Sequence, residues 1–338
     1  MNILQDMAAS LAVIPEALQA FLQAFPLARQ ALRSLGVVLP LAALLAFAGM
    51  GFLSTTARVL AVTRRRSSCE KLSRQLGLLG MCLGWLLLVG SRIWLFLTES
   101  AYASGSLLQL ALEISWTLLG VAVLCSSLYF TLWKHMRDMV AVHVMLGIAS
   151  GVAGCIALLA ALACARLLSA AALPPDIHLA LPEIFFPGWL SPFWRAIYWL
   201  PPLILAFAGG CGALWLVVRR KADDYGRDHY NAALPWCAAW ARNAWAVFWL
   251  LLLGSFLLDA FPDGQTASFS QEEFLREGAL LLFRLLPAVL WLPVSRSSAP
   301  LRLKPLVLAA LLAAVAFAQP YFDAVTAIAL PAGGAALP

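Results

Sequence analysis

Long apolar runs constrain this chain more than any other feature. A helix rises 1.5 Å per residue, so about 20 apolar residues are enough to cross a 30 Å hydrocarbon layer. Barrel strands are only about 10 residues long and alternate apolar with polar positions, a pattern that these runs do not have. The sequence therefore predicts an all-α polytopic membrane protein with eight transmembrane helices, near residues 36–62, 72–97, 106–133, 139–170, 196–219, 232–260, 276–295 and 302–323.

Composition agrees with this fold class. Hydrophobic residues make up 62% of the chain and charged residues 12%, against about 25% charged residues in a typical soluble domain. A chain with so few charges cannot cover itself with polar surface in water, so its partner is the lipid bilayer. The net charge of +6 does not indicate nucleic-acid binding, because in a membrane protein basic residues act mainly through their location.

Basic residues collect in alternate loops. Four of these loops hold 14 of the 23 Lys and Arg residues. Because basic loops stay in the cytoplasm, this asymmetry predicts that both termini lie on the outer side. The predicted location is a bacterial inner membrane with periplasmic termini. The 14 residues are Arg64, Arg65, Arg66, Lys71, Arg74, Lys134, Arg137, Arg219, Arg220, Lys221, Arg227, Arg296, Arg302 and Lys304.

Short repeats indicate an internal duplication. WLLLVGS at 85–91 returns as WLLLLGS at 249–255, and LAFAG at 45–49 returns at 205–209. Glu113 and Glu277 show the same spacing as the heptapeptides. We therefore predict two tandem four-helix bundles, related by an axis along the membrane normal. The predicted boundaries are 35–173 and 196–325 for the bundles, 174–195 for an outer interfacial loop and 326–338 for a tail.

The first 34 residues carry an apolar stripe. Its members recur every three or four positions, which is typical of an amphipathic helix. We expect residues 1–34 to form such a helix, which lies on the outer membrane surface or caps the bundle, and a partly ordered tail is the alternative. The stripe consists of Ile3, Met7, Leu11, Ile14, Leu18, Phe21 and Phe25.

Charged residues inside the helices are the first candidates for a site. Arg92 and Glu113 lie at similar depth on consecutive helices, and an unpaired charge in a membrane costs about 3 kcal/mol or more, so we expect them to form an ion pair. Glu277 and Arg284 repeat the combination in the second half. These four residues are candidates for a pocket on the outer side that holds a quinone headgroup or relays protons. The alternative is that the pairs only lock helices together.

Histidine and aromatic residues offer weaker candidates. His143 precedes a small-residue face (Gly147, Ser150, Gly151, Gly154) that could admit a helix or a porphyrin. His143 is thus a weak candidate for a haem ligand, but no helix core offers a second histidine, which disfavours haem b. We expect His178 and His229 to lie in solvated loops. A row of tryptophans could line a site for a flat-ring ligand or serve helix packing; it consists of Trp236, Trp240, Trp245 and Trp249. Arg242 and Asn243 form a separate polar pair on the same helix. The chain contains no metal or redox-cofactor motif.

Two stretches resemble membrane subunits of respiratory complexes. Residues 112–143 are similar to helix 3 and the head of helix 4 in cytochrome bd oxidase subunit I, in which Glu113 and His143 would match functional residues. The chain departs from that family because its first helix has no haem-ligand histidine and its loop between helices 6 and 7 is short. Residues 191–218 and the stretch LPLAALLAFAGMGFL resemble the fifth and first helices of the membrane anchors of polysulfide and dimethyl sulfoxide reductases. That resemblance implies eight helices, outward termini and quinone binding without haem.

Together these features predict a quinone-interacting subunit of a respiratory electron-transfer complex. The chain would bind quinone without itself carrying a redox centre, so a cytochrome or iron–sulfur partner would exchange the electrons. A membrane transporter and a structural or assembly subunit are the alternatives.

Overall fold

The computed structural model describes residues 26–98, 106–136, 138–171, 192–261 and 269–326. The chain divides into two units, residues 1–41 and 42–338. Helix α2 (Pro26–Thr63) begins in the first unit and continues into the second. Residues 1–25 of the predicted amphipathic helix, most of the predicted outer loop and residues 327–338 of the tail lie outside the described residues.

All regular elements in the described ranges are helices. Among the described residues, eight helices or helix pairs are long and apolar enough to cross a membrane, which confirms the all-helical class and the expected number of candidate spans. After α2 the elements are α3 (Ser67–Thr98), α4 (Leu107–Thr131), α5 (Val140–Ala171), α7 (Pro192–Asp223), α8 (Arg227–Ala260), α9 (Gln271–Phe283), α10 (Leu286–Arg296), the 3-10 turn η2 (Pro300–Leu303), α11 (Lys304–Phe317) and α12 (Gln319–Thr326).

The last two spans are interrupted. The predicted helix over 276–295 is α9 followed by α10, with a break at Arg284 and Leu285 just before Pro287. The predicted helix over 302–323 is α11 followed by α12, with a break at Ala318 just before Pro320. Proline has no backbone N–H and its ring clashes with the preceding turn. The apolar composition therefore predicts the length of each span correctly, and a proline divides the span into two helices.

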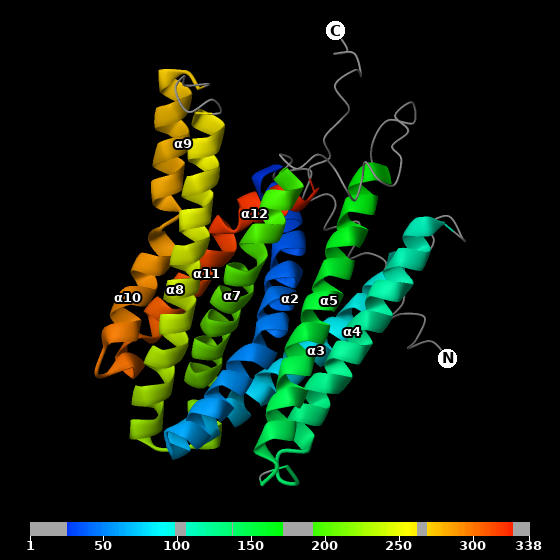
Figure 1. The fold of residues 1–338 in the computed structure, drawn as a ribbon. Helices are drawn as coiled ribbons and strands as arrows, with labels where there is room; N and C mark the ends of the chain where they lie inside the picture. Colours follow the sequence, from blue (N-terminus) through cyan, green and yellow to red (C-terminus); the bar gives the residue numbers. More distant parts are fainter. Residues whose placement is uncertain (1–25, 99–105, 137, 172–191, 262–268, 327–338) are drawn as a thin grey trace, which may run out of the picture. The chain divides into compact units, whose positions relative to one another are not determined.

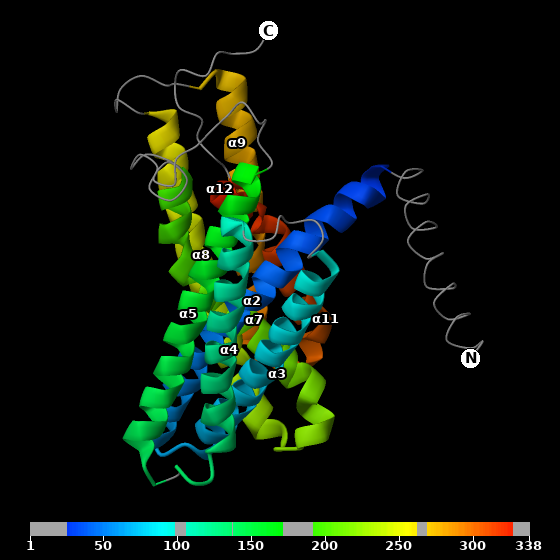
Figure 2. The same cartoon turned by 90° about the vertical axis from the view of Figure 1, so that its right-hand side faces the viewer.

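Small residues bring α2, from Ala42 on, against three neighbours. A Cβ added at Gly49 would lie 2.5 Å from the Ile204 carbonyl and 2.6 Å from Ala208 Cβ on α7. One added at Gly51 would overlap the backbone of Gly151 on α5. On α3, a Cβ at Gly80 would meet Met50 at 3.2 Å. Figures 1 and 2 show α2 running through the middle of this packing. The two LAFAG copies therefore meet each other at the α2–α7 contact.

Helices that follow one another in sequence pack side by side. In the first half α3 packs on α4 and α4 on α5, and in the second half α7 packs on α8, α8 on α10 and α10 on α11. The junctions α2–α3, α4–α5, α7–α8 and α10–α11, which include most of the basic residues, lie at one end of these helices (Figure 1). We call this end the basic end.

Candidate functional site

Arg92 and Glu113 are paired, as expected. The Arg92 guanidinium donates to both carboxylate oxygens of Glu113, at 2.9 and 3.1 Å. It also lies over the Trp116 ring, 5.2 Å from the centroid. The two side chains are 53% and 49% exposed, so the pair lies on the surface that α3 and α4 share. The structure thus shows the expected ion pair, with both of its side chains about half exposed.

The second charged pair is arranged differently from the first. Glu277 lies 3.3 Å from Arg276, its neighbour on the exposed helix α9. Arg284 follows the last residue of α9, and its carbonyl accepts the indole N–H of Trp245 at 2.8 Å. The backbone of Arg284 thus joins the helix break to α8.

His143 is buried between α4 and α5. Its Nε2 lies 2.9 Å from the Tyr129 carbonyl, its ring stacks on Tyr129 at 4.2 Å, and Trp133 meets it edge-on at 4.7 Å. The small-residue face behind it is covered by α2, because Cβ atoms at Gly147, Gly151 and Gly154 would meet Thr55, Phe52 and Ala48. The sequence left open whether this face packs against a helix or a porphyrin, and in the structure it packs against helix α2.

A buried polar cluster near the basic end was missed by sequence reasoning. Ser73 donates to the Ser54 carbonyl at 2.6 Å and shares a 2.9 Å hydrogen bond with the Tyr129 hydroxyl. Arg58, 4% exposed, lies 3.4 Å from Glu70 and 5.0 Å from the Trp133 ring centroid. The available signal was the similar depth of four polar side chains on consecutive helices, namely Arg58, Glu70, Ser73 and Tyr129. Each of them alone would be a common residue near the end of a membrane helix.

The prediction for His229 was wrong. His229 is 4% exposed and lies in the first turn of α8. Its Nε2 is 2.8 Å from Gln75 Oε1, and Gln75 donates to Asp223 at 2.7 Å. The charged run before it favoured a loop in the sequence, whereas the apolar spacing of α8 extends back to this residue. His178 lies outside the described residues.

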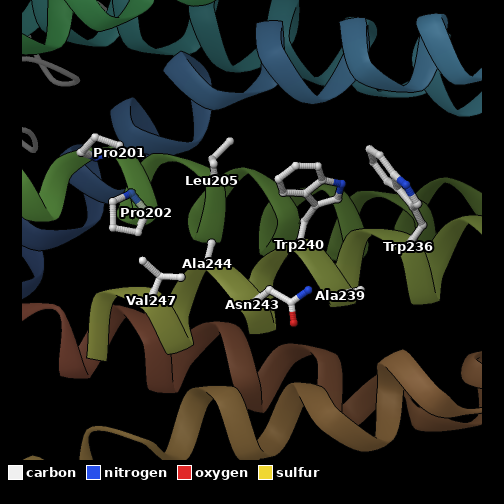
Figure 3. A pocket seen from close by; sticks show the side chains of 9 residues that line it. All are labelled: Pro201, Pro202, Leu205, Trp236, Ala239, Trp240, Asn243, Ala244 and Val247. Carbon is white, nitrogen blue, oxygen red and sulfur yellow. The ribbon is translucent and has the colours of Figure 1, made fainter. Parts of the chain in front are cut away.

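A groove between α7 and α8 is the best candidate for a ligand site. It has a volume of about 480 Å³ and is open along one side. The indoles of Trp236 and Trp240 reach from α8 towards α7 (Figure 3), with their centroids 5.9 Å apart. The other lining residues are Pro201, Pro202, Leu205, Ala239, Asn243, Ala244 and Val247.

Asn243 gives the groove a polar group. Its Oδ1 accepts from Nε and a terminal nitrogen of Arg242, at 3.0 and 2.8 Å. Arg242 is held in turn by Ser295 on α10, at 2.8 Å. These bonds orient the amide, whose NH₂ group has no partner among the described residues. Asn243 and the first two tryptophans of the row, Trp236 and Trp240, therefore line one groove. The other two, Trp245 and Trp249, instead donate to the carbonyls of Arg284 and Leu281.

The seven cysteines are free. Among the residues that the structure describes, no three His, Cys, Asp or Glu side chains gather as they would to hold a metal ion. Comparison with family models, characterised proteins and solved structures finds no match.

Proposed function

We propose that this chain is a quinone-interacting integral membrane subunit of a respiratory electron-transfer complex, and that the α7–α8 groove is its quinone site. The observation that carries the proposal is the lining of this groove: two indole faces, apolar walls and one oriented amide donor. We prefer this groove to the Arg92–Glu113 surface as the candidate quinone site. A half-exposed ion pair does not surround a quinone ring, whereas the groove can hold one.

The groove has the chemistry that a quinone requires. A quinone headgroup is a flat ring that can stack against an indole, and its carbonyl oxygens accept hydrogen bonds. In the proposed complex the Asn243 amide donates to one carbonyl, and Trp240 covers a ring face. The isoprenoid tail lies along apolar side chains such as Leu205 and Val247. Sites for small ligands are commonly apolar with few placed polar groups.

The length of the groove suits a ligand that enters from lipid. Eleven residues separate Trp236 from Val247 on α8, which is about 16 Å along the helix axis. That distance is about half of a 30 Å hydrocarbon layer. A ligand in the open groove can therefore keep its tail in one leaflet while its ring reaches the protein.

The wider assignment rests on the resemblance to reductase membrane anchors. Of the two stretches that carry it, one includes the part of α2 with LAFAG, and the other forms α7, one wall of the groove. In this proposal a cytochrome or iron–sulfur subunit exchanges electrons with the bound quinone. The chain then belongs in a bacterial inner membrane, with periplasmic termini and the basic end in the cytoplasm. A phosphatase reporter fused to the C-terminus should be active, and activity only from a cytoplasmic reporter would reject this topology.

We also propose that the two halves are tandem four-helix repeats. Trp85 on α3 donates to Ser127 on α4 at 3.1 Å, and its counterpart Trp249 on α8 donates to Leu281 on α9 at 2.8 Å. Each of these tryptophans thus joins the second helix of its half to the third. An experimental structure should superpose α2–α5 on α7–α12 with Glu113 near Glu277. If those residues fall at unrelated positions, the repeats are Leu-rich coincidence.

A photoreactive quinone tests the site. The chain is purified, reconstituted in lipid nanodiscs and irradiated with an azidoquinone that carries a short isoprenoid tail, and the labelled peptides are identified by mass spectrometry. Label should fall on α7 and α8 around Trp240, and excess unlabelled quinone should abolish it. Trp240→Ala and Asn243→Leu should reduce labelling at least fivefold, whereas Trp85→Ala on α3 should not. Labelling around Glu113 instead would overturn the groove, and no competed labelling would favour a transporter or a structural subunit.

A further inference from the structure

A second, smaller pocket lies at the basic end, between the α2–α3 junction and α8. Its volume is about 110 Å³, small enough to be filled by a single compact group such as a phosphate. Its lining combines polar residues of the α2–α3 junction with apolar residues that lie farther along α2, α3 and α8. They are Leu60, Arg64, Arg66, Ser68, Cys69, Leu72, Ala232, Ala233 and Trp236.

The two arginines of this pocket lack an acidic partner. Two other arginines near the basic end do have one, since Arg58 lies beside Glu70 and Arg219 donates to Asp223 at 2.8 Å. No carboxylate among the described residues lies within ion-pair distance of the Arg64 or Arg66 guanidinium. Two neighbouring positive charges on one small pocket repel each other, and an anion placed between them would relieve that repulsion. The pocket therefore fits an anionic group.

The apolar residues of the pocket indicate where this anion comes from. Leu60, Leu72 and Ala233 lie beside the arginines on the parts of α2, α3 and α8 that enter the membrane. A free anion gains nothing from an apolar wall, whereas the glycerol and first methylenes of a lipid would be covered by it. Basic pockets between helices on the cytoplasmic side are suited to anionic lipid headgroups.

We propose that this pocket binds the phosphate of an anionic phospholipid from the leaflet at the basic end. Arg64 and Arg66 bind the phosphate, Ser68 donates a hydrogen bond, and the acyl chains lie against the outside of α2 and α8. Trp236 lines both this pocket and the α7–α8 groove, so the bound lipid would support one end wall of the groove. The lipid site does not depend on the quinone proposal, because its charges and apolar residues stand without any occupant of the groove.

Lipid retention tests the proposal with variants that differ by one charge. The purified full chain is mixed with phosphatidylglycerol or phosphatidylcholine and the bound lipid is counted by native mass spectrometry. Arg64→Gln and Arg66→Gln should each weaken phosphatidylglycerol binding about fivefold. Arg65→Asn is the matched control, because Arg65 shares the turn without lining the pocket, and asparagine tolerates its positive φ of 50°. It should change binding less than twofold.

Cys69 provides a local readout, because it lines the pocket. Phosphatidylglycerol nanodiscs should slow its alkylation by a maleimide at least threefold relative to phosphatidylcholine, and Arg66→Gln should remove this protection. Equal protection by both lipids, or equal protection by inorganic phosphate, would overturn the assignment to an anionic lipid. An equal loss of binding in all three arginine variants would show general surface attraction and would also overturn it. If Cys69 resists labelling in both lipids, the retention measurement decides.

Discussion

Two of the arginine–glutamate pairs among the described residues, Arg92–Glu113 and Arg58–Glu70, differ in surroundings more than in geometry. Arg92 and Glu113 approach to 2.9 Å on the α3–α4 surface, where about half of each side chain is exposed. Arg58 and Glu70 are farther apart, at 3.4 Å, but the Arg58 side chain is only 5% exposed. The better hydrogen-bond geometry belongs to the more exposed pair.

The difference teaches that burial, and not distance, decides what a charge contributes here. Removing one member of a buried pair costs about 3–5 kcal/mol, and the lower end applies here because the Glu70 side chain is 33% exposed. Arg92 lies four residues before the end of the span Ser67–Phe96, and Glu113 lies six residues after the start of Leu107–Thr131. Water and lipid headgroups therefore reach this second pair, which should contribute about 0–1 kcal/mol, as solvent-exposed pairs do. Arg58 also lies over Trp133 and near the Ser73–Tyr129 hydrogen bond. The buried polar cluster around Arg58 and Ser73, called the inner cluster below, should therefore hold helices together. The exposed Arg92–Glu113 pair should be replaceable.

The largest contrast is expected at two glycines. Gly51 packs against the backbone of Gly151 beside the inner cluster, whereas a Cβ at Gly90, near Arg92, would meet nothing within 4 Å. Gly51→Ala should cost at least about 3 kcal/mol, because two helices must separate, and Gly51→Leu should prevent folding. Gly90→Ala should be neutral or gain up to about 1 kcal/mol from helix propensity. Size-exclusion profiles and thermal unfolding in detergent measure both changes, and equal losses would contradict the contrast.

The next contrast compares the two arginines directly. Arg58→Met should lower stability by about 3 kcal/mol, because Glu70 loses a buried partner and Trp133 loses its cation. Arg92→Met should cost less than about 1 kcal/mol, since methionine covers the same surface and Glu113 is half exposed. Thermal unfolding of the two variants checks the difference. Its reversal would mean that the α3–α4 surface is the more tightly held region.

These contrasts show where the sequence was sufficient and where it was not. The spans could be predicted because hydropathy over about 20 residues is a local property. The side of each helix that faces protein could not be predicted, because lipid tails are as apolar as leucine. On α4 and α5 apolar residues lie on every side of the helix. The glycines of α5 were the available signal. The α8 wall of the groove could be predicted in part, because Trp236, Trp240 and Asn243 were candidates from the sequence. The other wall could not, because nothing in the sequence shows that α7 packs beside these residues.

A smaller effect is expected from single hydrogen bonds. Tyr129→Phe removes the buried hydroxyl that Ser73 contacts at 2.9 Å and should cost about 1–2 kcal/mol, because buried polar groups lose a partner. Trp85→Phe removes an exposed indole bond to Ser127 and should cost less than half as much. Unfolding midpoints in the same detergent compare the two variants. A larger loss at Trp85 would show that the α3–α4 contact depends on this bond.

The smallest effect is expected at Glu113 itself. Glu113→Gln keeps the shape and one acceptor, so Arg92 retains a hydrogen bond, and water or lipid headgroups reach the half-exposed guanidinium. A double-mutant cycle with Arg92→Met should give a coupling energy below about 1 kcal/mol, and quinone labelling of the groove should be unchanged. A coupling of 3 kcal/mol or more would mean that this surface is buried in the assembled protein. In that case Arg92 and Glu113 would mark a contact with another subunit, and the comparison of the two pairs would have to be repeated in the complex.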